Sequence, residues 1–302
     1  MTELWIPVTI AAAFMQNARS ALQKHLTGRL STLGATYVRF LYALPFAILY
    51  VAGLHVIGGE ALPRPNRLFF LYVSLGGLAQ IVFTGLLMWL FSFRNFAVGT
   101  TFSKTEVIQV AILGLLILGD TLSPLAALAI VVAAAGVMIL SAGQTNLSAA
   151  ALVASLAEKP TLIGLASGAF LGASVVFFRG AALSLGHDSV IMAAAFALAV
   201  ALIIQTVIMG LYLLLKEPAT LADVVIQWRW AVAVGIAGVL ASIGWFTAFT
   251  LQNGAYVRAL GQIELIFTFI ASVLFFRERS SRAEIAGILL VAAGILLLIL
   301  GR

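Results

Sequence analysis

The chain has 302 residues, of which 63% are hydrophobic and 9% are charged, and its mean hydropathy is +1.13. This composition predicts an integral membrane protein rather than a soluble one. The absence of cysteine excludes disulfides, thiolate chemistry and cysteine-bound metals. The formal net charge of +6 does not indicate a nucleic-acid partner, because the basic residues lie at the ends of apolar segments, where they anchor helices at the lipid headgroups.

Ten stretches have the roughly 20 mostly apolar residues that a helix needs to cross the hydrocarbon core. They are residues 4–22, 35–57, 68–91, 98–118, 123–142, 162–184, 189–214, 230–251, 257–276 and 283–300. The first stretch has no basic region before it and no small-residue cleavage site, so we expect a retained span and not a signal peptide. The sequence predicts an all-α integral membrane protein with ten transmembrane helices.

An internal repeat organises these stretches. Residues 93–143 align without a gap to residues 251–301 at an offset of 158, and the alignment pairs Asn95 with Asn253, Glu106 with Glu264, and Asp120 with Glu278. The predicted domains are a first five-helix repeat over 1–143, a connecting loop over 144–161 and a second five-helix repeat over 162–302. Five is odd, so the second repeat must enter the membrane from the opposite side, as in many secondary transporters.

Polar side chains concentrate in the first, third, fourth, sixth, eighth and ninth stretches, which we expect to surround a central cavity. The fifth and tenth stretches are nearly pure Ala, Leu, Ile, Val and Gly, and we expect them outside it. In the sixth stretch Gly164, Gly168 and Gly172 recur at every fourth position, which predicts a close-packing face for a neighbouring helix.

Six ionisable residues fall inside the stretches: Arg19, Arg39, Lys104, Glu106, Arg179 and Glu264. Each costs about 2.5–3.5 kcal/mol at a helix centre, so six such residues are not expected to be incidental, and the excess of positive charge favours an anionic substrate group. Glu106 and Glu264 lie seven or eight residues into their stretches, too deep for a short side chain to reach the surface. Lys104 lies about 200° around the helix from Glu106, so we expect no intrahelical pair between them. Function is the preferred explanation for Glu106 and Glu264, with a structural ion pair as the alternative. A structural role is preferred for the four basic residues, and for Arg19 and Arg179 this role is that of interface anchors.

The candidate substrate-binding residues combine these charges with nearby amides and aromatic side chains that could line an apolar pocket. They are Glu106, Glu264, Lys104, Arg19, Gln80, Gln16, Phe83, Phe102, Gln262, Trp245 and Arg179. The three histidines lie far apart without ligand spacing, so no metal site is expected, and no cofactor is expected either. An enzyme is disfavoured, because the chain has no cysteine, no His-Glu-x-x-His and no nucleotide-binding loop.

Two matching turns carry a family resemblance. Gly119-Asp120-Thr121-Leu122 and Arg277-Glu278-Arg279-Ser280 each precede an alanine- and glycine-rich span with a late glycine, Gly136 or Gly294. With ten spans and inverted repeats, the chain resembles the drug/metabolite transporter superfamily, in particular its EamA-type branch. The family commonly has a proline near the positions of Glu106 and Glu264, and this sequence departs from it there. The resemblance implies export or exchange of small metabolites, with amino-acid exporters the nearest subgroup.

The preferred hypothesis is therefore a secondary transporter that exports or exchanges amino acids and related metabolites across the inner membrane by alternating access. The alternative is a multidrug exporter of organic cations that uses the two glutamates as its anions. The expected partners are a small-molecule substrate and the lipid bilayer, and the working hypothesis is a monomer. The resemblance implies cytoplasmic termini, whereas the basic residues counted over the loops favour the reverse orientation.

Overall fold

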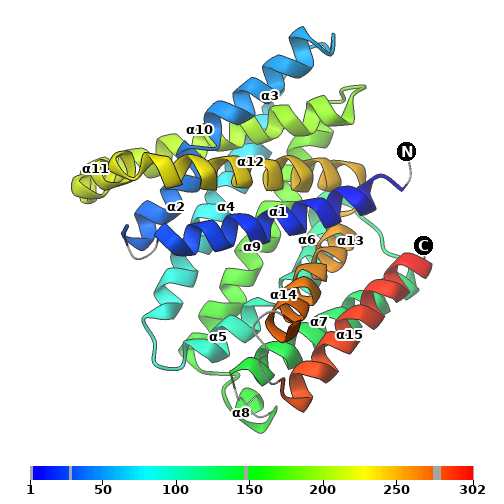
Figure 1. Cartoon of the computed structure of the whole chain (residues 1–302). Helices are drawn as coiled ribbons and strands as arrows, with labels where there is room; N and C mark the ends of the chain where they lie inside the picture. The colour runs from blue at the N-terminus through cyan, green and yellow to red at the C-terminus, as the bar shows by residue number, and fades with distance from the viewer. Residues whose placement is uncertain (1–2, 27–28, 146–148, 275–279, 302) are drawn as a thin grey trace. The chain divides into compact units, whose positions relative to one another are not determined.

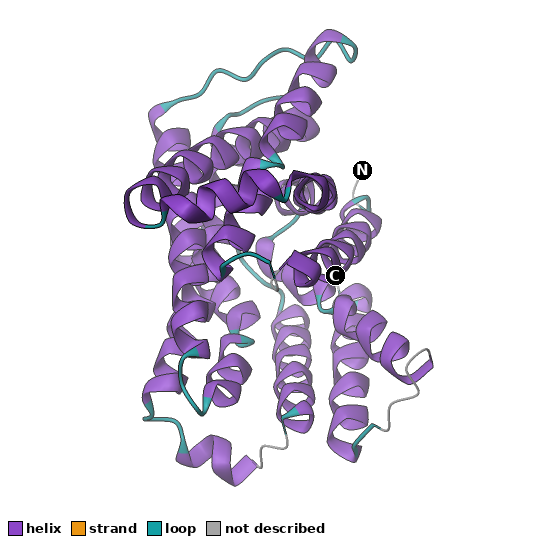
Figure 2. Cartoon of the chain, turned by 60° about the vertical axis from the view of Figure 1, so that its left-hand side comes forward, coloured by secondary structure: helices purple, strands orange, loops and turns teal. Residues whose placement is uncertain are grey.

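The computed structural model describes residues 3–26, 29–145, 149–274 and 280–301. Every regular element within these ranges is an α-helix and none is a strand (Figure 2). Contacts between Cα atoms divide the chain into two compact units, each containing segments from both halves of the sequence: 1–78 with 177–251, and 79–176 with 252–302. The predicted all-α membrane class is confirmed, whereas the predicted repeat boundaries at 143 and 162 stay a prediction.

The first unit is built around two long helices, α1 (Trp5–Leu26) and α12 (Trp228–Leu251), which pack along one another (Figure 1). A Cβ on Gly244 of α12 would lie 2.7 Å from the Cβ of Ala12. The unit also contains α2 (Thr32–Leu41), α3 (Leu44–Val56), α10 (Val190–Lys216), α11 (Pro218–Ile226), the first part of α4 (Arg67–Phe91) and the last part of α9 (Lys159–Ser184). Its most deeply buried large side chains are Trp5, Phe40, Phe69, Met192, Leu198 and Leu213.

The second unit contains the remaining parts of α4 and α9 and the segments that form the internal repeat. Its further helices are α5 (Phe96–Ser103), α6 (Glu106–Leu118), α7 (Pro124–Gln144), α8 (Ala149–Ala154), α13 (Gly254–Gly261), α14 (Ile263–Leu274) and α15 (Arg282–Leu300). The predicted loop over 144–161 thus includes the short helix α8, while residues 146–148 lie outside the described ranges. The acidic turn residue Glu278 also lies outside them.

Each of the ten predicted stretches is helical over its described residues, but three of them are broken into two helices. The second stretch forms α2 and α3, and the break is explained by a proline at the start of α3, where a missing backbone N–H is tolerated. The fourth forms α5 and α6, and the ninth forms α13 and α14. Within the described residues, seven helical segments are long and apolar enough to cross a membrane, or eight if α5 and α6 count as one bent span. A total of ten spans stays a prediction.

Helices α7 and α15, the fifth and tenth predicted spans, pack tightly against each other through glycine. A Cβ on Gly136 would lie 2.6 Å from the amide nitrogen of Val291, and a Cβ on Gly294 would lie 2.7 Å from that of Ala133. The contact positions rise along α15 as they fall along α7, so the two helices run antiparallel. The offset of 158 converts the first contact into the second. This reciprocity is the local two-fold relation that inverted repeats predict.

The close approach of α7 and α15 makes Gly136 sensitive to any side chain. We expect Gly136→Val to lower the stability of the detergent-solubilised protein by about 1–3 kcal/mol, because the added methyl groups must displace the backbone of α15. Thermal melting measures this. Gly85→Val in α4 is the control, since its Cβ would meet nothing within 4 Å. Equal melting temperatures for both variants would contradict the tight α7–α15 contact.

Candidate substrate-binding site

The fourth predicted span is interrupted between Ser103 and Glu106, and the axes of α5 and α6 differ by 43°. Hydroxyl groups bond to the backbone at the interruption. Those of Thr100, Ser103 and Thr105 each donate to the carbonyl three residues earlier, at 2.8, 2.8 and 2.7 Å. Such bonds compete with the regular helical ladder and bend helices. The backbone N–H groups of residues 104 and 105 likewise bond three residues back rather than four.

Glu106 is the first residue of α6, not an interior residue of an unbroken helix as the sequence analysis expected. The first four N–H groups of a helix have no intrahelical partner, and the helix dipole puts partial positive charge there. The start of α6 therefore stabilises the Glu106 carboxylate although the residue is buried. The 200° angle predicted between Lys104 and Glu106 does not apply, because Lys104 follows the last residue of α5 and Glu106 begins α6.

The ninth predicted span repeats this design. Helix α13 ends at Gly261 and α14 begins at Ile263, with Gln262 between them. The carbonyl of Gln262 accepts the N–H of Leu265 at 2.9 Å, and its side-chain Nε2 donates to the carbonyl of Arg258 at 3.3 Å. Glu264 is the second residue of α14. The two glutamates that the internal repeat pairs thus both lie in the first turn of a half-helix.

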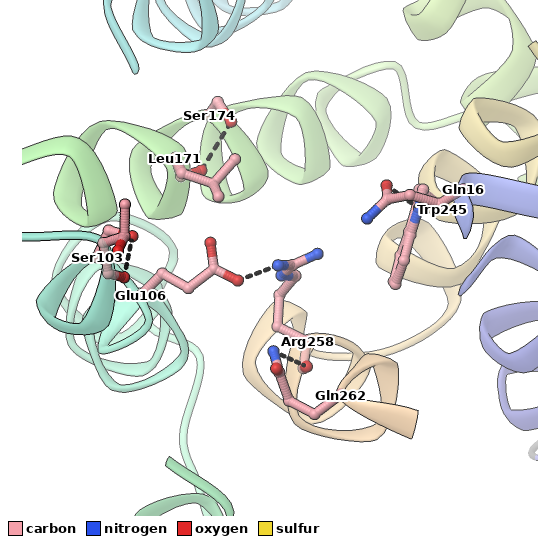
Figure 3. A network of polar contacts seen from close by, with 9 residues as sticks. Gln16, Ser103, Glu106, Leu171, Ser174, Trp245, Arg258 and Gln262 are labelled. Carbon is pink, nitrogen blue, oxygen red and sulfur yellow. Dashed lines mark hydrogen bonds and ion pairs between the residues drawn. The ribbon is translucent and has the colours of Figure 1, made fainter. Parts of the chain in front are cut away.

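An ion pair joins the two broken spans. Nη2 of Arg258, from α13, donates to Oε1 of Glu106, from α6 (Figure 3). The two side chains retain only 12% and 5% of their solvent exposure. Glu264 also attracts the Arg258 guanidinium electrostatically. One buried cation therefore interacts with two carboxylates, and the three groups carry a formal charge of −1.

The glycine face of α9 packs directly on the break between α5 and α6. A Cβ on Gly168 would lie 2.8 Å from the carbonyl oxygen of Ser103, and one on Gly164 would lie 2.1 Å from that of Gly99. A Cβ on Gly172 would meet Val110 at 3.3 Å. The predicted close-packing face is confirmed, and its partner is the helix pair that carries Glu106.

The second unit contains five further predicted site residues, two on α4 and three beside the helix breaks. Gln262 and Phe102 are close to the two breaks in the sequence, and both are buried. Lys104 is half-buried. Among the described residues, no hydrogen bond or ion pair links the Lys104 side chain to Glu106. Gln80 and Phe83 are half-buried on α4, where the carbonyl of Gln80 accepts the hydroxyl of Thr84 at 3.0 Å.

Four predicted residues belong to the other unit. Trp245 Nε1 on α12 donates to Gln16 Oε1 on α1 at 3.0 Å, so the structure brings this pair together. The aliphatic part of Arg19 packs over Gly238 of α12. Arg179 Nη1 donates to the carbonyl of Phe249 in the last turn of α12. That carbonyl has no intrahelical partner, so this contact of Arg179 stabilises a helix end.

Arg258 is the residue that the sequence analysis missed. It stands at the second position of the predicted ninth span and is not among the six embedded charges predicted from the sequence. In the structure α13 begins earlier, at Gly254, which places Arg258 inside the helix. The available signal was its position six residues before Glu264 in the same span. Its partner Glu106 is 152 residues away in sequence and could not be inferred.

Comparison with known proteins supports this architecture. The model of the EamA-like transporter family matches residues 3–142 and 158–300. A solved structure described as "Crystal structure of protein" has a TM-score of 0.72 to this chain at 16% sequence identity, covering 99% of this chain and 98% of that one. At this identity the likeness concerns the fold alone. The search of curated proteins gave no match.

Proposed function

The chain belongs to the EamA-like transporter family, matched over both halves, and from this premise we propose that it exports or exchanges amino acids and related small metabolites by alternating access. The family consists of membrane transporters of small molecules and not of enzymes. The amino-acid substrate, the inner membrane and the cytoplasmic termini are parts of the proposal. The observation that carries it is the buried pair of Glu106 and Arg258.

A zwitterion can replace both partners of this pair at once. The carboxylate of an amino acid would take the guanidinium of Arg258, and its ammonium would take the carboxylate of Glu106. Each buried charge then exchanges one partner for another, so neither is left unpaired. The planar fork of arginine suits a carboxylate because it can donate two parallel hydrogen bonds. The first turn of α6 also favours an acidic side chain at this position.

A lipophilic cation fits the pair less well. It would neutralise Glu106 but compete with Arg258, which would have to turn to another acid. The specific observation in favour of this alternative is Glu264, whose carboxylate also attracts Arg258 and makes the cluster formally anionic. Arg258 could move to Glu264 when a cation binds Glu106. Transport of a lipophilic cation should therefore require Glu264, whereas transport of an amino acid should not.

The two breaks support a mechanism for alternating access. Hydroxyl and amide side chains replace part of the helical ladder at residues 103–105 and at residue 262. Half-helices joined by such breaks can change their angle without losing a complete turn of hydrogen bonds. We propose that exchange of Arg258 between Glu106 and a substrate carboxylate changes the angle at the breaks. This would couple substrate binding to movement of the half-helices.

Proteoliposomes with purified protein test the proposal. Vesicles loaded with unlabelled neutral amino acids should accumulate radiolabelled neutral amino acids by exchange, and protein-free vesicles should not. Tetraphenylphosphonium serves as the lipophilic cation in parallel vesicles. Accumulation of the cation without exchange of any neutral amino acid would contradict the proposal and favour the multidrug exporter. The Glu264→Gln variant separates the two further, since it should impair transport of the cation more than that of the amino acid.

A further inference from the structure

A short helix of the first unit connects two helices that are long and apolar enough to cross a membrane. Helix α11 has nine residues and lies at one end of α12 (Figure 1). Only Glu217 separates it from α10, and only Gln227 separates it from α12. At 1.5 Å per residue it is roughly 13 Å long, which is too short to cross the hydrocarbon core. Helix α11 therefore lies at the ends of two spans.

The inner face of α11 packs on α2. Thr220 and Val224 are its buried residues. A Cβ on Gly34 of α2 would lie 2.8 Å from Cγ2 of Thr220, and the Thr220 hydroxyl donates to the Glu217 carboxylate at 3.1 Å. The carbonyl of Val224 accepts the hydroxyl of Tyr42, the residue that follows α2, at 3.1 Å. These contacts fix α11 against α2 and decide which of its faces turns outward.

The outer face of α11 is apolar. Its residues are all exposed and are Pro218, Ala219, Ala222, Val225 and Ile226. Val225 and Ile226 are 63% and 69% exposed. Asp223, the one charged residue of α11, lies at an edge of this face, about 160° around the helix from Val225. A surface helix in water has the opposite arrangement, with its apolar face inward and its polar face outward.

Aromatic and basic side chains flank this outer face. Trp228 and Trp230 begin α12 and remain 54% and 41% exposed. The Arg229 guanidinium lies over the Trp228 ring, 5.6 Å from its centroid. Lys216 is exposed in the last turn of α10. Tryptophan together with lysine or arginine at the end of a span is typical of the headgroup level of a bilayer.

We propose that α11 is an interfacial helix, whose outer face inserts between the headgroups and the acyl chains of zwitterionic phospholipids. Lipid is the occupant because the membrane-crossing helices on either side begin and end within one residue of α11. The charges of residues 216–229 are Lys216, Glu217, Asp223 and Arg229, and they sum to zero. Insertion therefore does not require anionic lipid and does not weaken with salt.

The test uses single cysteines in the full chain, which has none of its own, reconstituted in phosphatidylcholine vesicles. Val225→Cys, Ala222→Cys and Asp223→Cys carry the polarity-sensitive fluorophore NBD, and lipids brominated on their acyl chains quench NBD that contacts them. Ile203→Cys, exposed within the α10 span, is the lipid reference. Arg64→Cys, exposed between α3 and α4, is the water reference.

Quenching at position 225 should approach that at 203, and quenching at 223 should be as weak as that at 64. Replacing phosphatidylcholine by phosphatidylglycerol, or raising the salt concentration, should change neither result. In a second variant, Ile226→Asp should abolish most of the quenching of NBD at position 222, because a charge then lies in the apolar face. Ile226→Leu keeps the apolar area and should retain the quenching.

Three results overturn the proposal. Quenching at 225 as weak as at 64 places the outer face in water. Emission typical of an apolar environment without quenching by brominated lipid means that protein, such as a second copy of the chain, covers the face. Quenching that requires phosphatidylglycerol, or that persists in full in Ile226→Asp, excludes an apolar insertion into zwitterionic lipid. Melting temperatures of the labelled variants, compared with that of the wild type, verify that each is folded.

Discussion

Exchange of neutral amino acids should be lost in Glu106→Gln, although this variant should reach the membrane in the wild-type amount. Glutamine keeps the shape of glutamate and can accept a hydrogen bond from Arg258, and Glu264 remains as an acid that attracts the guanidinium. The fold therefore keeps a partner for Arg258. The substrate ammonium, in contrast, loses its carboxylate. Loss of one member of a buried charge pair costs about 2 kcal/mol or more, which is about 30-fold in affinity.

The Glu106→Gln experiment compares exchange in proteoliposomes with the amount and melting temperature of the inserted protein. Glu158→Gln is the matched control, since Glu158 is an exposed acid of the same unit. Wild-type exchange in Glu106→Gln would remove Glu106 from the proposed site. Poor insertion combined with normal exchange by the folded fraction would instead assign the carboxylate a structural role only.

Arg258→Met should give the largest loss of stability of any single substitution proposed for this chain. It leaves the buried Glu106 carboxylate, and Glu264 with it, without their guanidinium. Removing one partner of a buried ion pair costs about 3–5 kcal/mol, because the other charge stays desolvated. Thermal melting in detergent should show this loss, and the same variant should not exchange amino acids. Arg94→Met, at an exposed position between α4 and α5, should melt like the wild type.

The double variant Glu106→Gln/Arg258→Met separates the cost of an unpaired charge from the role of the pair in transport. It should recover most of the stability lost in Arg258→Met, because no carboxylate remains at residue 106, and it should still fail to exchange amino acids. A double-mutant cycle gives the coupling free energy of the pair. Additive effects on stability would mean that the contact between the two residues does not stabilise the protein.

Composition and periodicity were sufficient for the fold class and for the internal symmetry. The ten apolar stretches could be marked because a bilayer demands about 20 apolar residues from each crossing helix, and all ten are helical. The offset of 158 aligned Glu106 with Glu264, and the structure places both in the first turn of a half-helix. The spacing of Gly164, Gly168 and Gly172 likewise indicated a helix contact, since small residues permit close backbone approach.

The breaks and the ion pair were decided by the tertiary structure. Apolar length alone does not reveal where hydroxyl groups at residues 100–105 replace the helical ladder, because their hydrogen bonds form only in a particular backbone conformation. Arg258 and Glu106 are 152 residues apart in the sequence, and only the fold brings them together. By itself, the sequence determined the apolar segments and placed six charges inside them, but not Arg258. Only the packing of the helices decided which of them meet, because a buried charge is stabilised by the groups that the fold brings near it.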